Sequence, residues 1–114
     1  MITTIGDVAV VVSDAKKSAE WYRSKLGFKV FSSEGHWVTV GPAGATTVLH
    51  LCEEAQIEPG NTGIGLVCED LQKTYKELTG KGVEFTKKPA DDGFGMYAMF
   101  KDPDGNEFWL TPKE

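Results

Sequence analysis

Residues 7–28 read DVAVVVSDAKKSAEWYRSKLGF, and this stretch decides the fold. Its opening run, Asp7–Val12, is rich in β-branched residues and predicts a strand. Ser13 and Asp14 then supply an N-cap, and apolar residues recur every three or four positions, which places them on one face of a helix. Gly27 stands where the end of a helix favours a residue that can adopt positive φ. We therefore expect a strand followed by a helix.

Three short strands should follow that helix and complete the first half of the chain. They are expected at Phe28–Ser32, Trp37–Val40 and Thr46–Cys52. The segments between them are rich in Gly, Pro and Ser, which favour turns. The first half, about residues 1–56, thus reads as a βαβββ module.

The second half, about residues 60–114, repeats the same order of signals. A strand is expected at Ile64–Cys68, followed by an N-cap at Asp70 and a helix that ends near Gly82. The last three strands are expected at Val83–Thr86, Met96–Phe100 and Phe108–Thr111. The chain therefore contains a second βαβββ module.

Aligning the halves on each other places Asp14 opposite Asp70, Gly27 opposite Gly82 and His50 opposite Trp109. A repeated unit of this size cannot bury the apolar face of its sheet alone. We expect an α+β fold in which two βαβββ modules form curved mixed sheets around a cleft, with the helices on the outside.

A turn motif near the end of the chain adds to this pattern. In Asp102–Asn106 the proline fixes one φ angle, and the Gly-Asn pair tolerates left-handed conformations. Combined with the Leu26-Gly27-Phe28 helix end, the motif resembles the glyoxalase/bleomycin-resistance/dioxygenase superfamily, also called the vicinal oxygen chelate superfamily. The resemblance covers essentially the whole chain. It implies a single domain over residues 1–114 and, with the exposed sheet edges, a homodimer.

The composition excludes several classes of function. The chain has 114 residues with 12 Lys and Arg against 17 Asp and Glu, a formal net charge of −5, which argues against a nucleic-acid binder. No apolar segment approaches the roughly 20 residues that a membrane-spanning helix needs. Cys52 and Cys68 are too few for a disulfide framework. We expect a cytoplasmic protein that binds neither membranes nor nucleic acids.

The resemblance also implies where a metal would be held. The positions that match the superfamily's ligands are Asp7, His50, Gly63 and Trp109. Glycine has no ligating side chain, and an indole nitrogen only donates, so we expect no metal. The alternative is a divalent cation such as Ni, Zn, Mn or Fe held by Asp7, His50 and Glu107, because Glu107 shares a strand face with Trp109.

Strand alternation indicates which side chains line the cleft. Leu49 and Leu51 should point into the core and leave His50 on the other face, and Phe108 and Leu110 should do the same for Trp109. Aromatic walls with a few polar groups are typical of small-molecule sites. The residues predicted to bind a ligand are Asp7, Trp37, His50, Tyr97, Glu107 and Trp109. A further segment, Asp91–Gly95 with Phe94, reads as a solvated loop, or as one whose carboxylates attract a basic ligand.

Two functions remain open on the sequence. The preferred one is a metal-independent small-molecule binding protein of the glyoxalase/bleomycin-resistance type that sequesters an antibiotic or another aromatic or cationic compound, with no cofactor and no assigned catalytic residue. The alternative is a divalent-metal-dependent lyase or isomerase that resembles lactoylglutathione lyase. No sequence motif of a phosphate-binding loop, a dinucleotide fold or a serine hydrolase occurs.

Overall fold

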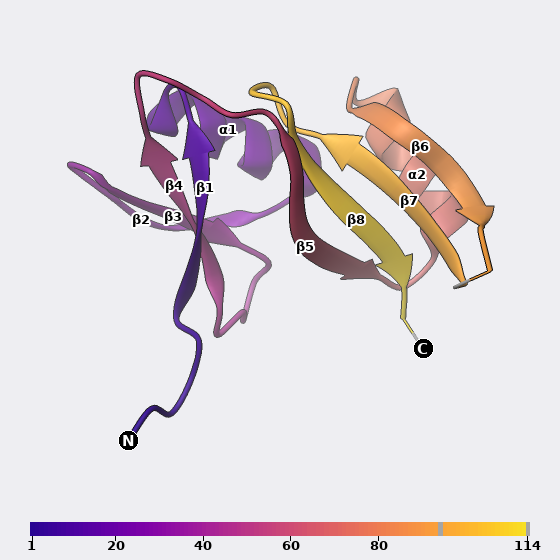
Figure 1. The fold of residues 1–114 in the computed structure, drawn as a ribbon, viewed down its shortest axis with the longest axis horizontal. Coiled ribbons are helices and arrows are strands. Elements are labelled where there is room, and N and C mark those ends of the chain that lie inside the picture. Colours follow the sequence, from indigo (N-terminus) through magenta and orange to yellow (C-terminus); the bar gives the residue numbers. More distant parts are fainter. Residues whose placement is uncertain (94, 114) are drawn as a thin grey trace. The chain divides into compact units, whose positions relative to one another are not determined.

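The computed structural model describes residues 1–93 and 95–113, so Phe94 and Glu114 lie outside the described residues. The chain divides into two compact units, the first spanning Met1–Ile57 and the second beginning at Glu58. In the first unit the elements are β1 (Asp7–Val12), α1 (Ala15–Leu26), β2 (Lys29–Glu34), β3 (Trp37–Gly41) and β4 (Val48–Glu53). In the second they are β5 (Gly60–Cys68), α2 (Leu71–Gly80), β6 (Glu84–Asp91), β7 (Met96–Lys101) and β8 (Asn106–Pro112) (Figure 1).

Each unit contains one four-stranded mixed sheet. The strand order is β1-β4-β3-β2 in the first unit and β5-β8-β7-β6 in the second. The first strand of each unit pairs parallel with the last, and the other pairs are antiparallel. The predicted α+β class and the repeated βαβββ order are therefore confirmed.

The helices begin and end at the residues that the sequence indicates. Asp14 caps α1 by accepting a hydrogen bond from the Lys17 backbone at 3.0 Å, and Asp70 caps α2 through the Lys73 backbone at 3.1 Å. Gly27 ends α1 with a φ of 71°, a left-handed conformation that glycine adopts without steric strain.

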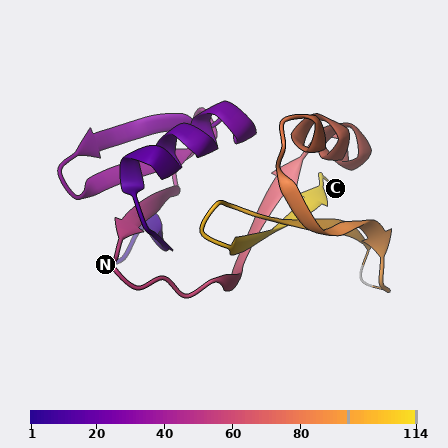
Figure 2. The ribbon, with the colours of Figure 1, turned by 90° about the horizontal axis from the view of Figure 1, so that it is seen from above.

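Each helix packs on one face of its own sheet (Figure 2). In the second unit the contact is a row of aromatic rings. Tyr75 of α2 meets Phe85 at 4.7 Å, Phe85 meets Phe100 at 5.6 Å, and Phe100 meets Phe108 at 5.8 Å between ring centroids. In the first unit Tyr22 of α1 is fully buried. The sheet of the same unit contributes the buried residues Val10, Val12, Val38, Val40, Leu49 and Leu51.

Two strands extend furthest beyond their predicted bounds. β6 was expected to end at Thr86 but continues to Asp91 and includes Pro89. It is an edge strand, and an edge position tolerates a proline because the missing N–H is not needed for pairing. β5 begins at Gly60, before the predicted Ile64. Neither extension was predicted, because the added segments consist largely of glycine and polar residues, which do not favour strands.

The strand that follows each helix contains a bulge. Pairing between β2 and β3 shifts register between Val30 and Ser32, and pairing between β6 and β7 shifts between Phe85 and Lys87. A bulge inserts one residue and redirects the side chains around it. The duplication therefore extends to this local irregularity.

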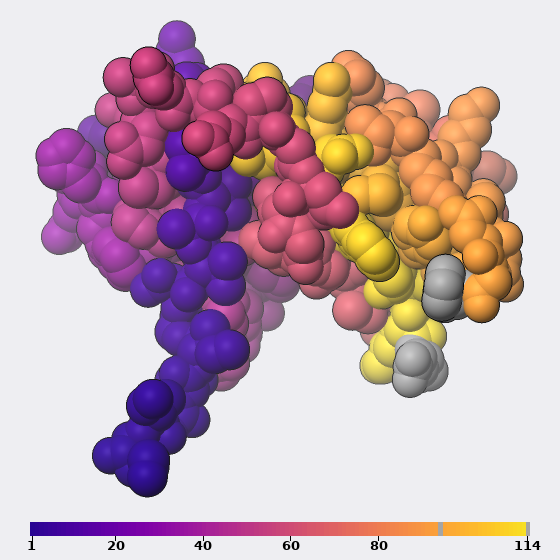
Figure 3. All heavy atoms as spheres, viewed as in Figure 1, coloured from indigo at the N-terminus to yellow at the C-terminus, as the bar shows by residue number. Residues whose placement is uncertain are grey.

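The first residues of the chain extend from the first unit as a tail. Figure 3 shows this segment in indigo, and Met1 and Ile2 are almost entirely exposed. Among the described residues, no helix has the length and apolar character needed to span a membrane.

Candidate ligand-binding faces

One face of each sheet lies opposite its helix, and we call it the open face. Along β4, Leu49 and Leu51 are buried while His50 between them is half-buried. Along β8, Phe108 and Leu110 are buried while Trp109 is 40% exposed. Because strand side chains alternate, His50 and Trp109 lie on the open faces of their own sheets.

The sheet register places these two residues at equivalent positions. His50 is paired with Thr39 on one side and Ala9 on the other. Trp109 is paired in the same way with Met99 and Gly65. The alignment of His50 with Trp109 that the sequence predicts is thus reproduced strand by strand.

The first open face carries a ring pair formed by Trp37 and His50. Their centroids are 4.5 Å apart at an interplanar angle of 39°, and Trp37 is 46% exposed. The His50 Nε2 lies 3.2 Å from the backbone carbonyl of His36. Since a carbonyl oxygen only accepts, Nε2 is the donor in this contact.

The second open face carries the matching pair, Tyr97 and Trp109. Their centroids are 5.3 Å apart and the rings are nearly parallel, at 20°. Offset stacking of this kind is a favourable arrangement for two aromatic quadrupoles. The Trp109 Nε1 donates to the Asn61 side-chain oxygen at 3.2 Å, which fixes the orientation of the indole.

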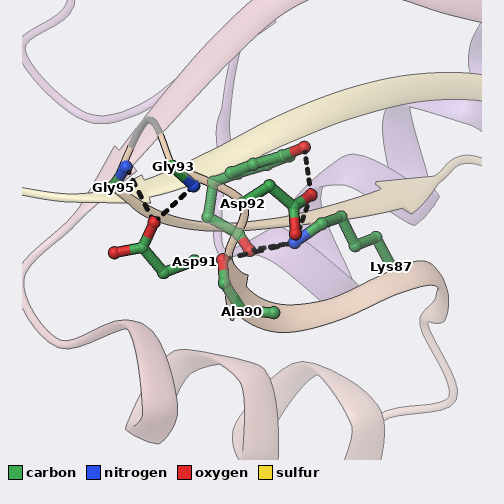
Figure 4. A network of polar contacts seen from close by, with 7 residues as sticks. Lys87, Ala90, Asp91, Asp92, Gly93 and Gly95 are labelled. Carbon is green, nitrogen blue, oxygen red and sulfur yellow. Dashed lines mark hydrogen bonds and ion pairs between the residues drawn. The ribbon is translucent and has the colours of Figure 1, made fainter.

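Lys87 closes one side of the second pair. Its Nζ lies 3.9 Å from the centroid of the Tyr97 ring, 3.3 Å from the Ala90 carbonyl oxygen and 3.2 Å from that of Tyr97. The same Nζ is 3.6 Å from the Asp92 carboxylate. Figure 4 shows this ammonium at the centre of the hairpin between β6 and β7. The lysine therefore joins the aromatic pair to the hairpin.

The two aspartates of this hairpin have separate partners. Asp91 accepts hydrogen bonds from the backbone N–H groups of Gly93 and Gly95 (Figure 4). Asp92 accepts one from the Tyr97 hydroxyl at 3.0 Å. That hydrogen bond, together with burial and the nearby negative charge, raises the pKa of Tyr97 above its usual value.

The two predicted carboxylates lie in different units. Asp7 is exposed at the start of β1, on the same sheet face as Ala9 and His50. Glu107 is half-buried in β8 and accepts a hydrogen bond from the Thr86 hydroxyl at 2.5 Å. Each open face therefore has one carboxylate as well as one ring pair.

The four positions that match the superfamily's metal ligands do not fit a metal here. Gly63 has no ligating side chain, and the Trp109 indole donates its only N–H to Asn61. In residues 1–93 and 95–113, no three His, Cys, Asp or Glu side chains are grouped so that they could hold an ion. The set of Asp7, His50 and Glu107 draws on both units and stays a prediction.

The sequence indicated Trp37, Tyr97 and Trp109 as single candidates, but it predicted neither their pairing nor the contacts of Lys87 and Asn61. Lys87 lies in a Lys-Lys-Pro run that reads as a solvated edge, and only the bulge before it places it against Tyr97. Asn61 lies in the part of β5 that was expected to be loop. No signal in the sequence distinguishes either residue.

A separate hollow of about 350 Å³ lies beside the start of α1. It is lined by Asp14, Ala15, Lys16, Gly35, His36 and Glu53. Both carboxylates already serve the helix, since Asp14 is its cap and Glu53 accepts the Ala15 N–H at 2.8 Å. None of the predicted ligand-binding residues lines it, so we place the candidate site on the open faces.

Comparison with known proteins agrees with this architecture. The sequence model of the Glyoxalase/Bleomycin resistance protein/Dioxygenase superfamily matches residues 4–110. The uncharacterized protein YetH of Bacillus subtilis (strain 168) is 36% identical over 118 residues, which cover 96% of this chain and 98% of YetH.

Two solved structures are similar over nearly their full lengths. A superfamily member from Sphaerobacter thermophilus DSM 20745 has a TM-score of 0.88 and 34% identity, with 98% of each chain covered. TnmS3, an antibiotic binding protein from Streptomyces sp. CB03234, has a TM-score of 0.87 and 31% identity, with 99% of this chain and 98% of TnmS3 covered. This chain belongs to the Glyoxalase/Bleomycin resistance protein/Dioxygenase superfamily.

Proposed function

We propose that the protein binds planar aromatic small molecules on its open faces and captures them without a metal. The observation that carries the proposal is the Tyr97–Trp109 pair, whose indole is exposed, and its recurrence at the equivalent register as Trp37–His50. Capture makes and breaks no covalent bond, so the proposal assigns no catalytic residue and no cofactor.

The exposure of the rings supports this proposal. Trp37 and Trp109 keep 46% and 40% of their surface in contact with water, although Phe100 and Phe108 of the second sheet are buried almost completely. Exposed apolar surface beside polar groups is typical of ligand sites. A flat ligand stacked on such a pair removes that surface from water.

The charges around the rings favour a ligand that carries a positive group. Asp7 and Glu107 supply one carboxylate to each open face, the Lys87 ammonium on the second face is already paired with Asp92, and the chain has a net charge of −5. An exposed indole also attracts a cation over its ring. TnmS3 is described as an antibiotic binding protein, and an antibiotic with an aromatic, cationic portion is the ligand class that we propose here.

We also propose that the chain acts as a cytoplasmic homodimer. Each sheet ends in edge strands whose backbone groups can pair with another chain, and both Cys52 and Cys68 are free thiols, which suits a reducing compartment. Sedimentation equilibrium should give twice the mass of one chain, whereas a single-chain mass would contradict the dimer. Recovery of the protein outside the cytoplasm of fractionated cells would contradict the location.

Calorimetric titration with proflavine, a flat cationic acridine, tests the binding function. The unmodified chain should bind it, and EDTA should not change the affinity. Stacking on an aromatic side chain is worth about 1 to 3 kcal/mol, so Trp109→Leu should weaken binding by roughly 5- to 150-fold.

Trp21→Leu is the matched control, because Trp21 lies in α1 and contacts Tyr22 edge-on at 5.1 Å. It removes the same ring from a different part of the chain and should bind like the unmodified protein. The proposal is wrong if proflavine does not bind, or if Trp109→Leu and Trp37→Leu both bind it as the control does.

A further inference from the structure

We infer that the outer face of Trp109 and the Glu107 carboxylate form a subsite for the positive group of the ligand, with Thr86 as the positioning residue. The outer face is the face of the indole that turns away from Tyr97. This inference deepens the proposed function and rests on it. The ligand class that such a subsite selects is an aromatic compound with an alkylammonium group.

Contacts within the chain already cover most of the second ring pair. Trp109 stacks against the Tyr97 ring at 5.3 Å, and the Lys87 Nζ lies 3.9 Å from the centroid of the same ring, so both faces of the phenol are occupied. The N–H edge of the indole is held by Asn61. Trp109 is nevertheless 40% exposed. A ligand therefore meets this pair at the outer face of the indole.

The sheet register places Trp109 between Tyr97 and Glu107 along the direction of the strands. Trp109 pairs with Met99, and Glu107 pairs with Lys101. Tyr97 precedes Met99 by two residues, so it lies on the side of Trp109 away from Glu107. Residues two positions apart on one strand share a face and are roughly 6 to 7 Å apart. The outer face of the indole therefore turns toward Glu107.

Glu107 is held beside that face by a neutral group. Its carboxylate accepts a hydrogen bond from the Thr86 hydroxyl at 2.5 Å. Lys101, which lies opposite Glu107 in the register, pairs instead with Glu84 at 2.9 Å. Within the part of the chain that the structure describes, no lysine or arginine forms an ion pair with Glu107. The carboxylate is therefore oriented, and no basic side chain balances its charge.

The opposite end of the same stack already holds an ammonium group. There the Lys87 Nζ lies over the Tyr97 ring and 3.6 Å from the Asp92 carboxylate (Figure 4). A cation is attracted both by the face of an aromatic ring and by a neighbouring carboxylate. The outer face of Trp109 offers a ring and a carboxylate without a side-chain ammonium between them. A ligand ammonium would complete the matching arrangement.

Two naphthalene probes test the inference, because they share a ring system and differ in charge. They are 2-naphthylmethylamine, which carries an ammonium at neutral pH, and 2-naphthalenemethanol, which is neutral. Dissociation constants are read from the Trp109 indole N–H signal in NMR titrations, so binding to the first open face does not contribute. The unmodified chain should bind the amine about 5-fold more tightly than the alcohol, from the ion pair and the cation–ring attraction together.

Substitutions at Glu107 and Thr86 separate charge from positioning. Glu107→Gln should weaken binding of the amine and bring the two affinities within about 2-fold of each other. Thr86→Val removes the hydroxyl and should reduce the preference for the amine partially, whereas Thr86→Ser keeps the hydroxyl and should retain the preference. The affinity for the alcohol should stay the same in all three variants, which distinguishes positioning of the carboxylate from a general disturbance of the sheet.

Glu69→Gln is the matched control. It removes the same charge from the second unit at an exposed residue that pairs with Lys113 at 3.7 Å. Because Glu69 lies between β5 and α2 and outside the open face, this variant should keep the full preference for the amine.

The outcomes separate this inference from the proposed function. Equal affinities of the two probes for the unmodified chain, or an undiminished preference in Glu107→Gln, would overturn the inference and leave aromatic binding intact. If Glu107→Gln does not fold, an undiminished preference in Thr86→Val would overturn it. Failure of both probes to shift the Trp109 and Trp37 signals of the unmodified chain would overturn the inference and the proposed function together.

Discussion

Tyr97 contacts three groups on the second open face. Trp109 stacks against its ring, the Lys87 ammonium lies above the ring, and Asp92 accepts a hydrogen bond from its hydroxyl. The ring pair is therefore held at its edge by polar contacts and not only by packing. Each of these contacts can be perturbed separately.

The hydroxyl contact predicts how Tyr97 titrates. Its pKa lies above the usual 10.0, because losing the proton breaks the hydrogen bond to Asp92 and places two negative charges together. The hydrogen bond from Tyr97 to Asp92 therefore stabilises the folded state fully at pH values below the usual tyrosine pKa. This stabilisation is lost as the pH rises through the raised pKa of Tyr97. Following the Tyr97 ring carbon by NMR should show a lower pKa in Asp92→Ala. An unchanged Tyr97 pKa in that variant would contradict the contact. The matched control is Asp91→Ala, because the Asp91 carboxylate accepts from the backbone of Gly93 and Gly95, and this variant should leave the Tyr97 pKa raised.

The regular parts of the strands could be predicted from the sequence, and the bulges could not. Alternation along β4 and β8 predicted that Leu49 and Leu51 enter the core and that His50 and Trp109 do not, since one strand face must be buried. The bulges in β2 and β6 could not be predicted, because their backbone shift leaves no mark on residue type. The position of Lys87 depends on such a bulge, and for that reason the sequence did not reveal it.

The turn between β7 and β8 carries a prediction about stability. Gly105 has a φ of 86°, and a Cβ atom there would lie 2.7 Å from the Pro59 Cβ. Gly105→Ala should therefore lower the free energy of unfolding by about 2 kcal/mol or more, from backbone strain and the contact together. Urea denaturation measures the loss, and Gly80→Ala at the end of α2 should lose nothing.

Replacing Pro59 as well separates the steric contact from the backbone strain at Gly105. In Pro59→Gly/Gly105→Ala the steric contact is absent but the strained φ remains. A double-mutant cycle should show a favourable coupling between the two substitutions. A Gly105→Ala variant as stable as the unmodified chain would contradict the turn geometry described here.

At the scale of the whole molecule, the repeated βαβββ unit gives the chain two open faces with different side chains. The ring pair and the bulge recur in both units, while Asp7, Ala9 and His50 of the first have Gly63, Gly65 and Trp109 as counterparts in the second. The first face thus pairs an indole with an imidazole, whereas the second pairs a phenol with an indole. The superfamily resemblance predicted the architecture, and we propose that these differences decide which ligands each face binds.

The most direct test of metal-free aromatic binding uses the indole N–H signals of the three tryptophans, Trp21, Trp37 and Trp109. In a heteronuclear NMR titration with proflavine in the presence of EDTA, the signals of Trp37 and Trp109 should shift and that of Trp21 in α1 should stay in place. Unchanged chemical shifts of Trp37 and Trp109, or shifts that occur only with a divalent metal present, would contradict metal-free aromatic binding.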